Sequence, residues 1–159
     1  MLIALTRFLN IMRDVSEPTP PGTGVIAETL SFIFSNIHDG LVIGTTNKTE
    51  NYLGYFTKFG DGACDVEPII HLLKREVRQL GESLGVPQKI VNKKPSAGLW
   101  EHQSDEDELG MTYDQMDQSV ENLFVKHERP VNKVDLKVLE LYHKTQHKRD
   151  FPVSLEEEK

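Results

Sequence analysis

Side chains that can bind anions or a metal ion recur through the middle and the end of this 159-residue chain. Glu50 offers a carboxylate, a hard oxygen donor of the kind that Mg²⁺ takes together with phosphate oxygens. Lys58 and Asp65 stand seven residues apart across the segment FGDGAC, and this spacing allows both to face one ligand. Amines bind phosphate or carboxylate groups, and hydroxyls add hydrogen bonds. Further residues of these types are Lys74, His147, Lys148, Thr45 and Ser96.

Each candidate also has a plain structural interpretation. An acid in the first turn of a helix and bases in the last turn complement the helix dipole, which would account for Glu50, His147 and Lys148. Hydroxyls cap helices and stabilise turns, which would account for Thr45 and Ser96. Taken singly, these interpretations are preferred. A functional assignment therefore depends on the surrounding motifs.

The charge balance argues against nucleic acid and membrane partners. Lys and Arg number 18 against 25 Asp and Glu, which gives a net charge of −7 and a pI near 5.4. A nucleic-acid binder usually shows a basic face and a high pI, and anionic membranes attract basic segments. No apolar run approaches the ~18 residues of a membrane-spanning helix. The single cysteine, Cys64, excludes an internal disulfide and is expected to be a small buried filler; a cytoplasmic location is expected.

The composition divides the chain into a leader and one domain. Residues 1–13 carry apolar side chains at helical spacing, and residues 14–24, DVSEPTPPGTG, are typical of a Pro-rich linker. The domain, 25–159, begins with a helix over 26–37. Because Phe32, Ile33, Phe34 and Ile37 make that helix apolar, we expect it to be buried against a second copy of the chain or under the leader helix.

The run LVIG, 41–44, predicts a strand buried on both faces. Thr45, Thr46 and Asn47 can cap the helix that follows. A buried strand that runs into a capped helix predicts an α/β fold with an open, mostly parallel sheet, in which ligands bind beyond the carboxyl ends of the strands. We therefore expect one cleft at the end of this strand, surrounded by Thr45, Glu50, Lys58, Asp65 and Lys74.

Three further helices are predicted. Pro68 opens one that ends at Gly85 and carries Lys74 on a basic face. A capping box at Thr112 begins another, to about Phe124. Asn132 caps the last, which continues to Thr145. The acidic run 101–108 is interpreted as a solvated loop or a helix start.

Four motifs resemble the ammonia-dependent NAD synthetases, in the family's order and spacing, over residues 38–152. They are LVIGTTNKTENYLGYFTKFGDGACDVEPIIHLLKREVRQL, KKPSAGLW, DEDELGMTYDQMD and YHKTQHKRDFP. The resemblance implies an ATP-dependent carbon–nitrogen ligase that transfers AMP to the carboxylate of deamido-NAD, with pyrophosphate leaving. Ammonia then attacks the acyl-adenylate, which releases NAD and AMP. It also implies a doubly wound parallel sheet of the adenine-nucleotide α-hydrolase type, only partly present and helix-rich in this chain, and a homodimer.

The resemblance assigns a role to each candidate residue. Glu50 matches the carboxylate that binds Mg²⁺. The residues matched to ATP contacts are Thr45, Lys74 and Ser96, and those matched to deamido-NAD contacts are Lys58, Asp65, His147 and Lys148. Asp65 is the candidate catalytic residue, near the incoming ammonia. Ser96 stands where the family commonly has Thr, and it keeps the hydroxyl.

Two features of the family are missing from the 159 residues. The glycine-rich SGGxDS loop, which cradles the ATP pyrophosphate and supplies a second Mg²⁺ ligand, does not occur. Val25 stands where an Arg contacts deamido-NAD, unless Arg7 or Arg13 folds over to replace it. We expect the C-terminal half of a synthetase, inactive or very weak alone. Three explanations stay open: a split enzyme whose loop is on a separate chain, a fragment, or a non-catalytic remnant that binds nucleotide or dimerises.

Overall fold

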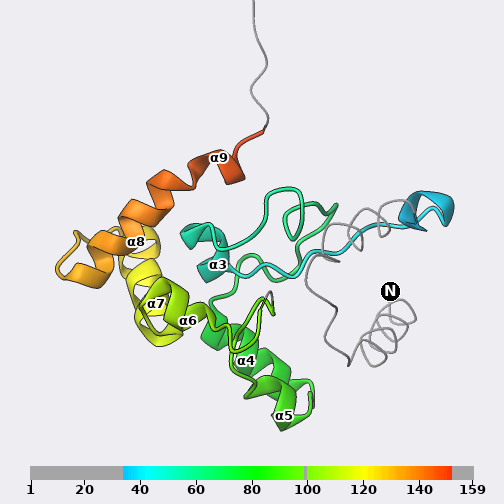
Figure 1. Ribbon diagram of the computed structural model, residues 1–159, viewed down its shortest axis with the longest axis horizontal. Coiled ribbons are helices and arrows are strands. Elements are labelled where there is room, and N and C mark those ends of the chain that lie inside the picture. The colour runs from blue at the N-terminus through cyan, green and yellow to red at the C-terminus, as the bar shows by residue number, and fades with distance from the viewer. Residues whose placement is uncertain (1–33, 99, 152–159) are drawn as a thin grey trace, which may run out of the picture.

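The computed structural model describes residues 34–98 and 100–151 and is mainly helical there (Figure 1). Residues 34–37 are helical, and eight bounded elements follow: α3 (Lys48–Leu53), α4 (Lys74–Ser83), α5 (Gln88–Val91), α6 (Asp105–Leu109), α7 (Tyr113–Val120), the π-helical turn η1 (Glu121–Val125), α8 (Lys133–Lys144) and α9 (Gln146–Arg149). The predicted leader, linker and first part of the helix 26–37 lie outside the described residues, as do Arg7, Arg13 and Val25.

The core is centred on α7, which contacts α3, α4, η1 and α8. Its fully buried members include Met116, Val120 and Val138, each with no exposed surface. Tyr52 and Phe124 pack against it and form an aromatic cluster with Tyr142, with ring centroids 4.5 to 5.6 Å apart. This packing fixes α3 and α4 relative to one another.

Three predicted helix starts are confirmed. The Asn47 side chain accepts a hydrogen bond from the Glu50 N–H (3.0 Å), and the Glu50 carboxylate accepts one from the Asn47 N–H (3.1 Å). Thr112 begins α7 with the predicted capping box, and Asn132 caps α8. α7 and η1 together end at Val125, close to the predicted Phe124.

The segment 41–44 is not a strand buried on both faces, so that prediction is wrong for the described residues. Ile43 forms an isolated parallel bridge with Val66, and Gly44 N–H donates to the Val66 carbonyl (2.7 Å). Leu41 is 66% exposed and Ile43 is 40% exposed. A parallel strand is buried only where neighbouring elements cover both of its faces, and no longer ladder forms within 34–98 and 100–151.

The helix predicted from Pro68 begins six residues later, at Lys74. Residues 68–72 form turns, and Leu73 is extended with ψ at 159°. The Glu76 carboxylate accepts a hydrogen bond from the Leu73 N–H (2.7 Å), which defines the helix start there. Gly85, with φ at +74°, follows the end of α4 as predicted.

The apolar face predicted to be covered on helix 26–37 is uncovered where the structure describes it. Phe34 is 64% exposed and Ile37 is 72% exposed, while Phe32 and Ile33 lie outside the described residues. Cys64 is half-buried, less than predicted, and burial raises the pKa of its thiol. None of the described helices is both long and apolar enough to cross a membrane.

Candidate functional site

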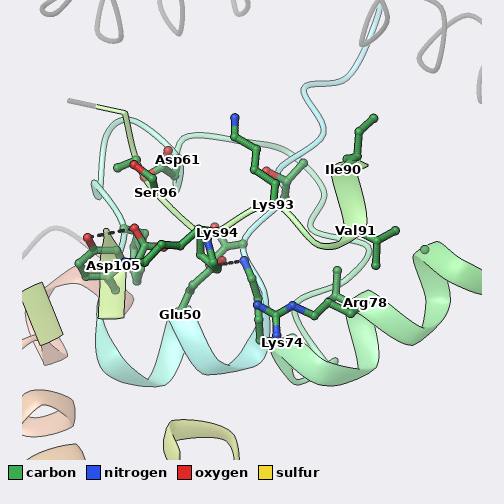
Figure 2. Close-up of a pocket in the computed structure, with 18 of the residues that line it drawn as sticks. Glu50, Asp61, Lys74, Arg78, Ile90, Val91, Lys93, Lys94, Ser96 and Asp105 are labelled. Carbon is green, nitrogen blue, oxygen red and sulfur yellow. Dashed lines mark hydrogen bonds and ion pairs between the residues drawn. The ribbon is translucent and has the colours of Figure 1, made fainter. Parts of the chain in front are cut away.

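A cavity of about 570 Å³ opens between α3, α4 and the loop 93–97 (Figure 2). Thr45 and Thr46 line it immediately after the bridged segment 41–44, so the cavity lies at the carboxyl end of that segment. Glu50, Lys74 and Ser96 also line it. Four of the predicted site residues are thus brought together: Thr45, Glu50, Lys74 and Ser96.

An ion pair between Glu50 and Lys74 forms part of the cavity wall. Glu50 Oε1 lies 2.8 Å from Lys74 Nζ, and the two side chains are 17% and 22% exposed (Figure 2). The capping box holds Glu50 at the start of α3. The Lys74 amine also lies 5.0 Å from the centre of the Tyr113 ring, at cation–π distance. The pair is therefore held in place while remaining within reach of a ligand.

Two buried residues behind this pair, Asp105 and Tyr113, were not predicted as site residues from the sequence. Asp105, only 5% exposed, lines the cavity and accepts hydrogen bonds from the Tyr113 hydroxyl (3.0 Å) and the Tyr55 hydroxyl (3.3 Å). The Tyr113 hydroxyl also lies 3.5 Å from Glu50 Oε1. Burial, with the nearby Glu50 and Asp105 carboxylates, raises the pKa of Tyr113, so this hydroxyl remains a donor. The acidic run includes a helix start, one of its two predicted interpretations, because α6 begins at Asp105. Asp105 itself is buried, since the two tyrosines that contact it come from outside the run.

Basic side chains form a positive rim on the cavity, whose lining also includes the acids Glu50, Asp61 and Asp105. Arg78, Lys93 and Lys94 line it in addition to Lys74. Lys94 pairs with the exposed Asp107 (2.9 Å). Within the described ranges, no carboxylate lies within ion-pair distance of Arg78 or Lys93. Fixed cations around a hollow of this size favour an anionic ligand.

Lys58, His147 and Lys148 do not line the cavity; they meet in an adjoining contact between residues 54–58 and 147–150 that we call the C-terminal clamp. Tyr55 and Phe56, within the first of these ranges, also line the cavity. Lys148 Nζ donates to the carbonyls of Gly54 (2.7 Å) and Phe56 (2.8 Å). In the opposite direction, Lys58 Nζ donates to the carbonyls of His147 and Asp150, both at 2.6 Å. Burial lowers the pKa of Lys148. Both amines are therefore engaged by the backbone.

Asp65 lies apart from both places. Its Oδ2 accepts a hydrogen bond from the Val42 N–H (2.8 Å) beside the parallel bridge, and its side chain is exposed. The predicted convergence around one cleft thus holds for Thr45, Glu50 and Lys74 but not for Lys58 and Asp65.

The donors at the cavity suit a hard cation only in part. Among the residues that the structure describes, no group of three or more His, Cys, Asp and Glu side chains could hold a metal ion. Glu50 contributes one carboxylate, and Asp105 is joined to it through the Tyr113 hydroxyl. Mg²⁺ commonly takes one or two protein carboxylates and completes its shell with phosphate oxygens and water. The residues present therefore fit Mg²⁺ that arrives with a phosphate ligand.

Comparisons with known proteins identify relatives of this chain. The sequence is 51% identical to the NH(3)-dependent NAD(+) synthetase of Thermoplasma volcanium over 124 residues, which cover 78% of this chain and 51% of that protein. It is 39% identical to the enzyme of the same name from Mesoplasma florum over 158 residues, which cover 94% of this chain and 63% of that protein. The chain spans about half the length of the first of these relatives.

Solved structures show the same relationship. The NMN synthetase of Francisella tularensis superimposes with a TM-score of 0.74 at 34% identity, and the NH3-dependent NAD synthetase of Campylobacter jejuni with 0.66 at 25% identity. Each match covers 96% of this chain and 63% of the other. The NAD synthase family matches residues 26–152, which include the cavity and the clamp. The chain therefore belongs to the NAD synthase family.

Proposed function

We propose that this chain supplies the C-terminal half of an ammonia-dependent NAD synthetase site. The reaction is ATP-dependent amidation of deamido-NAD through an acyl-adenylate that ammonia attacks. The observation that carries the proposal is the Glu50–Lys74 pair, set with Thr45 and Ser96 around one cavity at the end of a parallel β-bridge. The proposal includes the family's wider setting: a doubly wound parallel sheet of the adenine-nucleotide α-hydrolase type, a homodimer and a cytoplasmic location.

In the proposed complex, ATP binds at the positive rim of the cavity. Lys74, Arg78 and Lys93 can meet phosphate oxygens, and the Thr45 and Ser96 hydroxyls can donate hydrogen bonds. Adenylation makes few covalent demands on the protein, so positioning and fixed charge supply most of the catalysis. Two of these cations, Lys74 and Arg78, are held on α4, and Lys93 lies in the loop 93–97, so the cavity wall meets that requirement.

Glu50 is the residue that would hold Mg²⁺ with the phosphates. Its carboxylate faces the cavity, and its present partner there is the Lys74 amine. Bound at this position, the ion would neutralise phosphate charge as pyrophosphate leaves. Lys74 would then be released from Glu50 and could turn to a phosphate oxygen.

The proposed contacts to deamido-NAD are Lys58, Asp65, His147 and Lys148, with Asp65 near the incoming ammonia. The proposal rests on the family motifs, and it has a structural condition. Lys58 and Lys148 each donate to two backbone carbonyls, so a substrate phosphate would have to replace those hydrogen bonds.

A competing function is that of a module that binds nucleotide or dimerises without turnover. We expect the 159-residue chain alone to make little or no NAD, because it lacks the glycine-rich loop and because losing even one donor to a developing charge commonly costs ~10²–10³ in rate. The test supplies ATP, Mg²⁺, ammonia and deamido-NAD, and measures NAD and AMP while calorimetry measures MgATP binding. Saturable MgATP binding without turnover by the chain alone is expected for both functions. Formation of NAD when a separate chain carrying the glycine-rich loop is added supports the half-site, and binding without turnover in that arm supports the non-catalytic module. Turnover near 1–10³ s⁻¹ would show that another segment replaces the loop, and absence of binding would overturn the proposal.

A second candidate product is NMN, because the Francisella protein whose structure superimposes with the TM-score of 0.74 is an NMN synthetase. The same assay separates the two products if the deamidated mononucleotide is offered beside deamido-NAD. A supplement carrying the glycine-rich loop as a separate chain is included in both arms.

A further inference from the structure

We infer that Asp117 is a positioning residue that aligns Glu50 with Lys74 at the cavity. Asp117 belongs to α7, has no exposed surface and does not line the cavity. Its importance to the reaction rests on the proposed function, whereas its effect on the ion pair can be measured without any ligand.

One carboxylate joins the two helices that carry the ion pair. Asp117 Oδ2 accepts a hydrogen bond from the Arg75 N–H (2.8 Å), and Oδ1 accepts one from the Lys74 N–H (3.3 Å). Oδ1 also accepts a hydrogen bond from the Thr49 hydroxyl. Thr49 is the residue before Glu50 in α3, and Lys74 is the first residue of α4. The backbone on either side of the ion pair is thus tied to the same group.

The start of α4 depends on this outside partner. The N-cap residue is Leu73, whose side chain accepts no hydrogen bond, so the first N–H groups of α4 need acceptors from elsewhere. Glu76 accepts from the Leu73 N–H, and Asp117 accepts from the Arg75 N–H. The Lys74 N–H is shared between Asp117 Oδ1 and the Thr49 hydroxyl oxygen, both at 3.3 Å. A buried carboxylate is tolerated only when such donors satisfy it. Removing its charge should therefore loosen the start of α4, and the Lys74 side chain with it.

Asp135 provides a matched control for a role limited to stability. It is also buried, at 2% exposed, and it accepts hydrogen bonds from the Ser119 hydroxyl (2.7 Å) and the Val131 N–H (2.9 Å). None of these three residues lines the cavity. A variant of either aspartate should lower stability, but only the Asp117 variant should disturb the cavity.

The test compares Asp117→Asn with Asp135→Asn in the full chain. Amide hydrogen exchange by NMR reports the start of α4, and calorimetry reports the Kd for MgATP. For Asp117→Asn we expect the Lys74 and Arg75 amides to exchange at least ~10-fold faster, and MgATP to bind about 10- to 100-fold more weakly, the range for hydrogen bonds to a charged group. For Asp135→Asn we expect the exchange rates of these two amides and the Kd for MgATP to stay within about two-fold, once exchange through global unfolding is taken into account.

Thr49→Val removes one of the three donors to Asp117, and it replaces Asp117→Asn if that variant does not fold. Because the Thr49 hydroxyl also accepts a hydrogen bond from the Lys74 N–H, the readout for this variant is the Arg75 amide, which should exchange faster. Unchanged exchange at Arg75 in both variants would overturn the inference, and so would equal loss of MgATP affinity in the Asp135 control. If the unmodified chain binds no MgATP, the proposed function fails, while the exchange rates still decide whether Asp117 positions the pair.

Discussion

Lys74 at the cavity and Lys148 in the C-terminal clamp are both half-buried amines, yet they have different kinds of partner. Lys74 pairs with the Glu50 carboxylate, and under the proposed function an incoming Mg²⁺ would take the place of the Lys74 amine there. Lys148 donates to the carbonyls of Gly54 and Phe56, which belong to the folded backbone. The residue type is the same in both places. The acceptor distinguishes an amine that is free to exchange partners from one that holds two segments together.

The largest loss of stability should come from Gly54→Ala in the clamp. Gly54 has φ at +64°, and a Cβ there would overlap the Cβ and Oγ1 atoms of Thr145. Backbone strain and overpacking together should lower the free energy of unfolding by about 2–5 kcal/mol. Denaturant unfolding measures it. Gly85→Ala is the control, because Gly85 has φ at +74° with no atom within 4 Å of the added Cβ, so only the strain remains. Equal losses in the two variants would mean that the close approach to Thr145 is unimportant.

Glu50→Gln should affect the cavity and spare the fold. Glutamine can keep the capping hydrogen bond to the Asn47 N–H, so stability should fall by about 1 kcal/mol or less. Loss of the carboxylate should weaken MgATP binding by about 10²-fold, on the scale of metal-site substitutions. Calorimetry measures the Kd. Glu76→Gln is the control, since Glu76 has the same capping role in α4 and does not line the cavity. A similar loss of affinity in the control would show that helix capping, not the cavity carboxylate, matters.

Lys148→Met should lower stability more than it lowers MgATP affinity, the reverse of Glu50→Gln. It leaves the carbonyls of Gly54 and Phe56 without their amine donor, which should cost about 1–3 kcal/mol of stability. MgATP affinity should fall much less than in Glu50→Gln, because Lys148 does not line the cavity and contacts its lining at the Phe56 carbonyl. Thermal unfolding and calorimetry on the same samples give both quantities. Lys144→Met, at an exposed position on α8, should change stability by only about 0.5 kcal/mol. A Lys148→Met variant that keeps its stability but no longer binds MgATP would show that the clamp and the cavity are not functionally separate.

The smallest effect should be the acid dependence of Asp135, which belongs to neither region. Burial works to raise the pKa of Asp135, but hydrogen bonds from Val131, Ser119 and Asn132 outweigh it and hold the pKa below its ordinary value. A depressed pKa adds stability above the ordinary value of ~3.9, and this stability is lost as the pH falls through the folded-state pKa. The difference of about 1 kcal/mol between the unmodified chain and Asp135→Asn should therefore narrow from pH 7 to pH 3. Denaturant titrations at both pH values measure it, and a widening difference would contradict the stated cause.

Signals that reach only a few residues along the chain predicted the starts of α3, α7 and α8. Asn47, Thr112 and Asn132 each cap a helix through a residue three positions later, so the pattern is visible in the sequence. The start predicted at Pro68 failed because the acceptors that begin α4 include Asp117, more than 40 residues away. Periodicity could not reveal that partner.

The site was predicted in its residue types more than in its geometry. Four candidates line one cavity, but the Glu50–Lys74 pair spans 24 residues and the contact from Lys58 to Asp150 spans 92. Asp105 and Asp117 carry no signal in the spacing, since their partners are tyrosines and backbone groups from other parts of the chain. The exposure of Leu41 and Ile43 was likewise not predictable, because a β-branched run does not show whether neighbouring strands cover it.

The most direct test of the separation between cavity and clamp is an NMR titration of the chain with MgATP. Backbone amide shifts should change saturably at Thr45, Glu50, Lys74 and Ser96, which line the cavity. The backbone amide shifts of Lys58, His147 and Lys148 should not change. Shifts centred on the clamp, or no saturable change at the cavity residues, would contradict the assignment of the cavity to ATP.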